Sequence, residues 1–322
     1  MCTAVTYRTT DHYFGRNLDL EYSYSEAVTV TPRRFPFTFR FADPIKSHHA
    51  IIGMAMISDG YPLYYDATNE KGLSVAGLNF PDNAVYHPPR EQAQNITPFE
   101  LIPWLLSRCS CVADAQRLLE NVNLADVPFS KEYPLTPLHW IVADSKRSIV
   151  LEPLKSGLKI LENPVGVLTN NPPFEYHLHN LKNYLNLTPK EPTNRFASQI
   201  DLTPYSRGMG ALGLPGDLSS SSRFVRAAFT KMNSVCCDSE LESVGQFFHI
   251  LGSVEQQAGC VQVGEKFEKT VYSSCCNTNK GIYYYTTYNN RQITGIDMHS
   301  TDLESAELTV YPLEDRQRIR ML

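Results

Sequence analysis

The chain begins Met1-Cys2-Thr3-Ala4-Val5-Thr6-Tyr7, and this stretch says most about its fold and chemistry. Cysteine is a small residue, so removal of Met1 in the cell is expected and would leave Cys2 as the N-terminus. A terminal cysteine carries a thiol, with an ordinary pKa of about 8.5, beside an α-amine with an ordinary pKa of about 8. Near neutral pH the amine can take the proton of the thiol, which unites nucleophile and general base in one residue. The competing interpretation is an accidental second residue, and the remaining sequence decides between them.

The composition is that of an ordinary globular protein. Of the 322 residues, 42% are hydrophobic and 20% are charged, which is far from the composition of disordered chains. The formal net charge of −5, without any run rich in Lys and Arg, argues against nucleic-acid and membrane-surface binding. Residues 1–16 are polar and lack the apolar segment of a signal peptide, and no run approaches a membrane span. We expect a cytoplasmic protein, without membrane insertion, in which residues 1–322 form one domain.

The cysteine pattern favours neither disulfides nor metal binding. There is no CxxC pair, and no cysteine has a histidine at the spacing of zinc ligands. We expect most of the thiols to be reduced, buried and small hydrophobic groups, with a mixed structural zinc site as the alternative. No metal and no organic cofactor is expected. The eight residues are Cys2, Cys109, Cys111, Cys236, Cys237, Cys260, Cys275 and Cys276.

Local patterns predict blocks of strands that alternate with blocks of helices. Strands are indicated by β-branched and aromatic residues between turn formers, at 4–7, 13–18, 28–31, 50–57, 73–79, 138–143, 148–152, 165–169, 271–275, 282–287, 292–297 and 307–311. Helices are indicated by caps and apolar stripes, at 98–108, 112–122, 175–185, 222–232 and 240–254. Such an order favours a layered α+β domain with mostly antiparallel sheets over a doubly wound sheet.

A thiolate nucleophile needs a nearby cation, a carboxylate to hold the α-amine, and donors for an oxyanion. The segment Phe14-Gly15-Arg16-Asn17-Leu18-Asp19 would run back beside Cys2 in a hairpin, bringing Arg16 and Asp19 with it. Gly15 permits close approach of the backbone. An isolated Arg/Asp pair of this kind is most often a surface ion pair.

Three further segments place polar residues where an apolar strand ends or a helix begins. Asn79 ends Ala76–Phe80, and Asn170 lies in Gly166–Pro172; an ordinary turn is the alternative for both. In Ser220-Ser221-Ser222-Arg223-Phe224 the serines indicate a helix cap, with Arg223 in the first turn. A cation there is unfavourable for the helix dipole, and this local conflict hints at a functional role.

Together these segments resemble the choloylglycine hydrolases, which comprise bile salt hydrolases and penicillin V acylases, within the N-terminal nucleophile hydrolases. The resemblance extends over essentially the whole chain, and the number of segments in the right order makes it specific. It is carried by residues 1–3, 14–19, 69–73, 76–80, 138–140, 166–172, 214–217, 222–224 and 280–285.

The resemblance implies an αββα four-layer sandwich of two mostly antiparallel sheets, with Cys2 at a sheet edge. It also implies roles for six residues. Cys2 would be the nucleophile with its own α-amine as base, Asp19 would hold the amine, and Arg16 and Arg223 would lie near the thiolate. Asn170 and the backbone at Asn79 would bind the oxyanion. An Asn at position 79 is typical of the bile salt hydrolases, whereas penicillin V acylases often have Tyr.

A steroid is a rigid apolar body, so its pocket needs aromatic and aliphatic walls. Apolar residues beside the segments above are the candidates, with ordinary core packing as the alternative for about half of them. We expect His48, His49, His177 and His179 at the surface and His139 as a hydrogen-bonded core residue. The candidate pocket residues are Leu18, Leu20, Tyr22, Tyr24, Ile57, Tyr61, Tyr65, Phe129 and Leu135.

The sequence therefore predicts a cysteine amidohydrolase that releases glycine or taurine from conjugated bile acids through a Cys2 thioester. The alternatives are penicillin V acylase or a related N-acyl amidase, a non-catalytic bile-acid-binding relative, and a papain-like Cys/His enzyme. The resemblance also implies a homotetramer from a gut bacterium, acting on small molecules.

Overall fold

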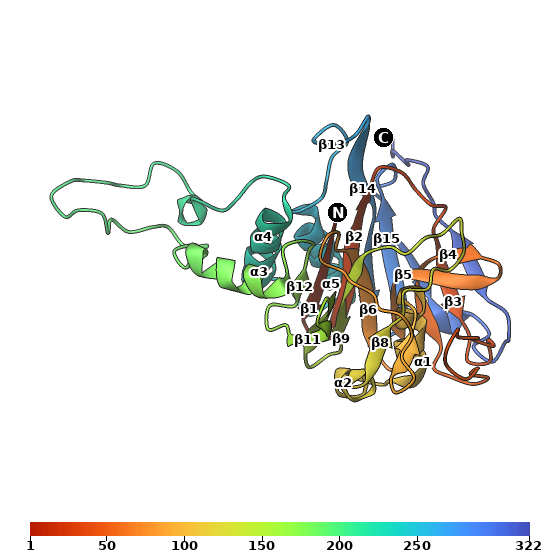
Figure 1. Ribbon diagram of the computed structural model, residues 1–322. Helices are drawn as coiled ribbons and strands as arrows, with labels where there is room; N and C mark the ends of the chain where they lie inside the picture. Colours follow the sequence, from red (N-terminus) through yellow and green to blue (C-terminus); the bar gives the residue numbers. More distant parts are fainter.

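A computed structural model describes all 322 residues and shows two large sheets packed face to face, with helices on both outer faces (Figure 1). All pairings within the two large sheets are antiparallel. The first sheet has the order β12 (Val167–Leu168), β1 (Cys2–Arg8), β2 (His12–Leu20), β14 (Lys266–Asn277), β15 (Ile282–Thr287) and β16 (Thr294–Asp297), with β13 (Val261–Val263) paired to β14.

The second sheet has eight strands and packs against the first through β6. Its order is β11 (Gly157–Glu162), β10 (Ser148–Leu154), β9 (Leu138–Ala143), β6 (Ser74–Asn79), β5 (Tyr61–Asn69), β4 (Ile51–Ser58), β3 (Ala27–Thr31) and β17 (Thr309–Pro312). A small parallel pair joins β7 (Gln94–Ile96) to β8 (Val122–Leu124).

The helices complete the four layers. The seven-stranded sheet is contacted by α4 (Ser220–Asn233) and α5 (Glu240–Gly252), and α3 (Phe174–Asn180) packs on α4. The eight-stranded sheet is contacted by α1 (Leu101–Arg108), which α2 (Val112–Leu119) follows. Short 3₁₀ turns occupy Pro98–Glu100, Leu181–Tyr184, Met209–Ala211 and Met298–Ser300. The αββα sandwich predicted from the resemblance is confirmed.

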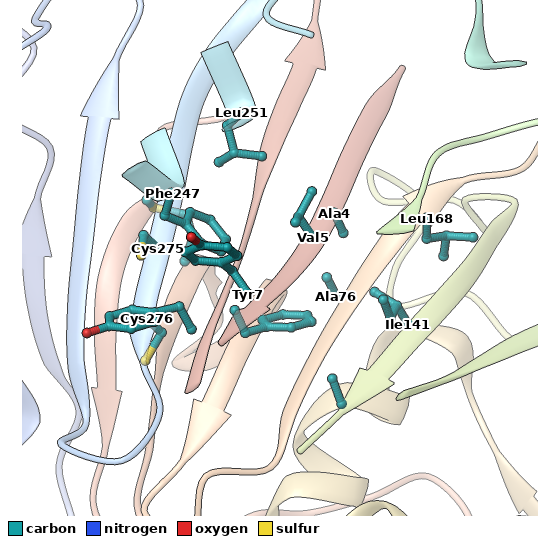
Figure 2. Packing of buried hydrophobic residues seen from close by; sticks show 14 of the residues in the cluster. Ala4, Val5, Tyr7, Ala76, Ile141, Leu168, Phe247, Leu251, Cys275 and Cys276 are labelled. Atoms are coloured by element: carbon teal, nitrogen blue, oxygen red, sulfur yellow. The ribbon is translucent and has the colours of Figure 1, made fainter. Parts of the chain in front are cut away.

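The alternation of apolar residues along the strands explains the layers. In β6, Ala76 and Leu78 belong to the core cluster shared with the first sheet, whereas Val75 belongs to the cluster under α1. In β9, Ile141 likewise belongs to the cluster shared with the first sheet, and Trp140 belongs to the cluster under α1. Successive side chains of a strand point to opposite faces, so a sheet covered on both sides has two apolar faces. Figure 2 shows the inner cluster, where residues of both sheets and of α5 pack together.

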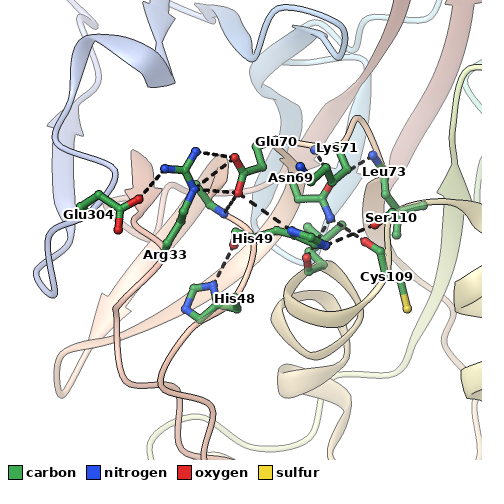
Figure 3. A network of polar contacts seen from close by, with 12 residues as sticks. Arg33, His48, His49, Asn69, Glu70, Lys71, Leu73, Cys109, Ser110 and Glu304 are labelled. Atoms are coloured by element: carbon green, nitrogen blue, oxygen red, sulfur yellow. Dashed lines mark hydrogen bonds and ion pairs between the residues drawn. The ribbon is translucent and has the colours of Figure 1, made fainter.

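A polar network fastens the turn between β5 and β6 (Figure 3). The Asn69 amide donates to the carbonyl oxygens of Leu106 and Cys109, each at 2.8 Å, where α1 ends. The Glu70 carboxylate accepts three hydrogen bonds from Arg33, at 2.7–3.2 Å. Despite partial burial, Arg33 and the amide of Ala50 lower the pKa of Glu70 to about 2. Residues 69–73, one of the segments that carry the resemblance, therefore stabilise the fold at this turn.

Most predicted elements are present, and the exceptions have local causes. Strand β5 was not predicted, because Pro62 and a polar, irregular pattern interrupt it. Strand β11 was also missed, since Lys159 and flanking polar residues hide its alternation. The second helix ends at Leu119 rather than at Val122, which instead begins β8.

Two expectations about single residue types were partly wrong. Only Cys2, Cys109, Cys275 and Cys276 are buried, whereas Cys237 and Cys260 are exposed; all eight thiols are free. His48 and His177 are buried rather than at the surface. His139 is buried as expected, with its ring nitrogens 2.9 Å from the Thr169 oxygen and 3.4 Å from the Glu152 carboxylate. No helix has both the length and the apolar character needed to cross a membrane.

Candidate active site

Cys2 is the first residue of β1 and is 2% exposed. It pairs in register with Leu18 of β2, and Ala4 pairs with Arg16. Since paired residues point to the same face, Cys2 and Arg16 share the face that looks toward the second sheet. The structure carries Met1, which continues the ladder: its oxygen accepts from the Asp19 amide at 3.0 Å, and its ammonium donates to the Asp19 oxygen at 2.8 Å.

Arg16 is fully buried and crosses from the first sheet to the second. Its Nη1 donates to the carbonyl oxygens of Tyr65, at 3.1 Å, and of Gly77. Its Nη2 has no hydrogen-bond partner. Burial opposes the charge, but the nearby Cys2 and the anionic groups around it raise the pKa of Arg16 above its usual range. The preceding residue must be glycine for β2 and β14 to lie this close together, because a Cβ at Gly15 would lie 1.9 Å from the Ser274 backbone oxygen.

Asp19 lies near the C-terminal end of β2, next to Leu18, which pairs with Cys2, and it is also fully buried. Its Oδ1 accepts from the Thr270 hydroxyl at 2.6 Å, and its Oδ2 has no partner. Burial raises the pKa of Asp19, while the charges of Arg223 and of the N-terminal ammonium act in the opposite direction. A buried carboxylate with one free oxygen is suited to hold an ammonium group.

Asn170 joins the nucleophile to the second sheet. Its Oδ1 accepts from the Cys2 nitrogen at 2.8 Å, and its Nδ2 donates to the Asn79 oxygen at 2.7 Å. The Asn170 amide nitrogen donates in turn to the Ser220 hydroxyl at 2.8 Å. Thus Asn170 and the backbone of Asn79 meet beside Cys2, as the resemblance implied.

Arg223 lies beside Cys2, although 221 positions separate them in the sequence. Its Nη1 donates to the Cys2 oxygen and, at 2.7 Å, to the Thr3 hydroxyl. Its Nη2 donates to Asn170 Oδ1 at 2.7 Å, and its Nε to the Leu218 oxygen at 3.0 Å. Ser219 caps α4, so Arg223 is in the first turn. Burial lowers the pKa of Arg223, against the charges of Asp19 and Cys2.

Sequence reasoning missed the residues that support this cluster. His177 Nε2 donates to the backbone carbonyl oxygen of Asn170 at 2.9 Å, and the His177 ring stacks on Phe224 at 4.8 Å between centroids. Burial lowers the pKa of His177 to about 4, so the ring is neutral at pH 7 and Nε2 is the donor. His177 carries no local signal, because its contacts come from a distant segment. Ser220 was expected in the helix cap, but Ser219 is the cap, and the Ser220 hydroxyl contacts Asn170 and Thr169 instead.

The predicted pocket residues fall into several groups. Leu18 is buried next to Cys2 within the main core, and Leu20 follows on the same face of β2. Tyr65 packs against that core, next to the carbonyl oxygen that Arg16 binds. Exposure reaches 44% for Tyr22, 40% for Tyr24 and 36% for Ile57.

Tyr61 and Phe129 lie elsewhere, with their ring centroids 6.0 Å apart in the aromatic cluster around Phe37. Leu135 is half-buried. A cleft of about 620 Å³ lies at the other end of β1, around Arg8, His12 and Lys231, and includes no predicted site residue. These positions leave the steroid contacts as a prediction.

The geometry can support nucleophilic attack on an amide. A buried thiol lies with two guanidinium groups, a carboxylate and the side-chain amide of Asn170. Cations and preorganised donors favour a thiolate and an oxyanion in a site shielded from water. The structure contains no group of three or more His, Cys, Asp or Glu side chains that could hold a metal ion.

Comparison with known proteins identifies the family. Residues 2–311 match the family described as linear amide C–N hydrolases, choloylglycine hydrolase family. A bile salt hydrolase/transferase of Lactiplantibacillus plantarum is 56% identical over 314 residues, 97% of each chain. One from Clostridium perfringens is 38% identical over 97% of this chain and 96% of its own.

Solved structures agree. A mutant of the conjugated bile acid hydrolase from Clostridium perfringens superposes with a TM-score of 0.92 at 36% identity, over 100% of both chains. A penicillin V acylase from Agrobacterium tumefaciens reaches 0.75 at 19% identity, over 98% of this chain and 94% of its own, and so shares the fold. The chain belongs to the choloylglycine hydrolase family of linear amide C–N hydrolases.

Proposed function

We propose that the protein is a bile salt hydrolase that cleaves the amide bond of glycine- or taurine-conjugated bile acids. The observation that carries the proposal is the 56% identity, over 97% of both chains, with a relative named bile salt hydrolase/transferase. The buried cluster around Cys2 supplies the chemistry that such a reaction needs.

In the proposed mechanism Met1 is removed, and the Cys2 α-amine takes the proton of the thiol as sulfur attacks the amide carbonyl carbon. The Asn170 side-chain amide and the backbone at Asn79 stabilise the oxyanion that forms. The same amine returns the proton to the leaving nitrogen, which departs as glycine or taurine. Water then hydrolyses the thioester, which releases the bile acid and restores the thiol.

The two arginines and Asp19 have supporting roles in this mechanism. Arg16 and Arg223 favour the thiolate, since a guanidinium group keeps its charge at every working pH. Asp19 holds the α-amine through its free Oδ2. We also propose that Leu18, Leu20 and Tyr65, which lie close to the cluster, contact the steroid, with Tyr22, Tyr24 and Ile57 at the rim of its pocket.

A second candidate activity is acyl transfer, because the relatives from Lactiplantibacillus plantarum and Clostridium perfringens are both named hydrolase/transferase. In that reaction an amine in place of water attacks the thioester carbonyl. The alternative of penicillin V acylase activity has only a shared fold behind it.

We further propose a cytoplasmic homotetramer, with a gut bacterium as its source. Residues 185–219 project from the body of the molecule between α3 and α4 (Figure 1). This arm exposes Phe196, Tyr205 and Leu212, each by more than two thirds. Contact with other copies would cover these side chains. Light scattering of the intact chain and of a Phe196→Ser/Tyr205→Ser variant tests the assembly.

The activity is tested by incubating protein of verified mass with glycocholate, taurocholate and penicillin V, with and without an added amino acid. Release of glycine or taurine supports the hydrolase, and a new conjugate supports the transferase. Rapid turnover of penicillin V alone would overturn the proposal.

A further inference from the structure

A buried carboxylate, Asp66, lies in the core between the two sheets and is not among the six residues of the proposed catalytic cluster. Asp66 of β5 is 1% exposed and accepts three hydrogen bonds, all from the opposite sheet. Its Oδ1 accepts from the Tyr272 hydroxyl at 2.6 Å, and its Oδ2 from Tyr283 at 2.7 Å and from Ser274 at 3.2 Å. Asp66 thus crosses the core between the sheets, where an ionised side chain is costly unless it is paired.

A β-bulge aims Asp66 into this core. Between β4 and β5, Met54 pairs with Asp66 and Ala55 pairs with Tyr64, so Tyr65 is an extra residue. Regular alternation would place Tyr64 and Asp66 on one face. Instead Tyr64 packs in the outer cluster beneath α1, and Asp66 reaches the tyrosines of the other sheet. Bulges next to active sites commonly redirect a side chain in this way.

The same bulge also holds Arg16. The carbonyl oxygen of Tyr65 accepts from Arg16 Nη1, so one residue binds the guanidinium and the next supplies a negative charge. Ser274 completes the link, since its hydroxyl accepts from the Arg16 amide at 3.1 Å and donates to Asp66. Arg16 and Asp66 therefore cross the same core in opposite directions.

The ionisable groups around Arg16 come from four strands: Cys2 on β1, Asp19 on its own β2, Tyr272 on β14 and Asp66 on β5. Burial raises the pKa of Asp66, and Arg16 followed by the hydroxyl donors acts to lower it. Arg16 thus shares its face of the sheet with Cys2, and Tyr65 and Ser274 link it to the Asp66 carboxylate.

We propose that Asp66 is a positioning residue of the active site, which fixes Arg16 behind Cys2 and limits how much of its charge acts on the thiolate. The proposal rests on the proposed function only in taking Cys2 as the nucleophile.

The test is Asp66→Asn, which keeps the shape and removes the charge. Iodoacetamide labelling is followed across pH by mass spectrometry of the tryptic peptide Cys2–Arg8, which contains only one of the eight cysteines. Because an anion near Arg16 is lost, the midpoint of labelling should move to lower pH by roughly 0.5–1 unit. With glycocholate, kcat should fall about tenfold and KM should change less than about twofold.

Tyr64→Phe is the matched control. It removes a buried hydroxyl two residues away, bonded to Thr31 at 2.7 Å on the outer face, and should leave the labelling midpoint unchanged. If Asp66→Asn does not fold, Tyr283→Phe removes one donor to the carboxylate and should give a smaller shift in the same direction.

A second measurement compares Tm values. Arg16→Gln leaves Asp66 without its cation and should lower Tm by roughly 5–15 °C, whereas adding Asp66→Asn should recover several degrees. A labelling midpoint in Asp66→Asn equal to that of Tyr64→Phe, or no recovery in the double variant, would overturn the proposal. Labelling needs no bile salt, so a wild-type protein that failed on glycocholate would refute the proposed function and leave this test intact.

Discussion

Replacement of Arg223 by Gln should weaken both the fold and the reactivity of Cys2. The guanidinium group is fully buried and serves four acceptors, on Cys2, Thr3, Asn170 and Leu218. Gln supplies two donors at most, so two or more buried acceptors lose their partner at about 1–3 kcal/mol each. We expect the free energy of unfolding to fall by about 2–5 kcal/mol.

The effect on chemistry is set by the lost charge. A unit charge about 6 Å from a partner contributes roughly 2–3 kcal/mol at an effective dielectric constant near 20, which corresponds to about two pH units. The labelling midpoint of Cys2 should therefore rise by about 1–2 pH units in Arg223→Gln. Turnover should fall more at low pH than at high pH, because raising the pH restores the thiolate.

Arg226→Gln is the matched control for this prediction. Arg226 lies one turn further along α4 and donates to the carbonyl oxygens of Ser253, Pro215 and Asp217, none of which touches Cys2. It loses the same charge without losing a contact at the nucleophile, so its labelling midpoint should stay close to that of the wild type. Equal midpoints for the two variants would refute the role of Arg223.

Cys2→Ser should abolish turnover of glycocholate in a stopped assay, since a hydroxyl is a far weaker nucleophile beside an amine suited to a thiol; ordinary activity would remove Cys2 from the mechanism. Asn170→Ala should lower kcat by about 100–1000-fold with little change in KM, as for the loss of one oxyanion donor, and a change confined to KM would assign Asn170 to substrate binding. The pKa of Glu70 is lowered to about 2 in the folded protein, from about 4.5 in the unfolded chain. The ionised Glu70 therefore stabilises the fold at pH values above about 4.5, and this contribution is lost as the pH falls toward 2. Urea denaturation measures how much the free energy of unfolding drops between pH 7 and pH 3. This drop should be about 2–3 kcal/mol smaller in Glu70→Gln than in the wild type, and identical drops would contradict the pairing with Arg33.

Strand alternation and helix caps are local signals, and they predicted a layered α+β domain with mostly antiparallel sheets, whereas the four-layer order came from the resemblance. The sequence also predicted which segments surround Cys2, but only through the order of nine segments along the chain. Arg16, Asn170 and Arg223 look individually like surface or turn residues, and only the fold makes them neighbours of one thiol.

The parts that could not be predicted depend on contacts between distant strands. Asp66 lies in a strand that Pro62 obscures, and its direction is set by a bulge that no local pattern marks. His177 supports Asn170 from a helix whose sequence reads as exposed and polar. Such residues become visible only when the two sheets are placed together.

The central claim is that the α-amine of Cys2 is the general base, and retention of Met1 tests it most directly. With Met1 attached, the Cys2 nitrogen is an amide that donates to Asn170, and Met1 continues the β1–β2 ladder without disturbing it. Glycocholate hydrolysis is to be measured for protein with Met1 removed and for protein with an uncleavable N-terminal extension, both verified by intact mass and circular dichroism. We predict that the extended protein folds normally and is inactive; hydrolysis at the rate of the processed protein would contradict the account.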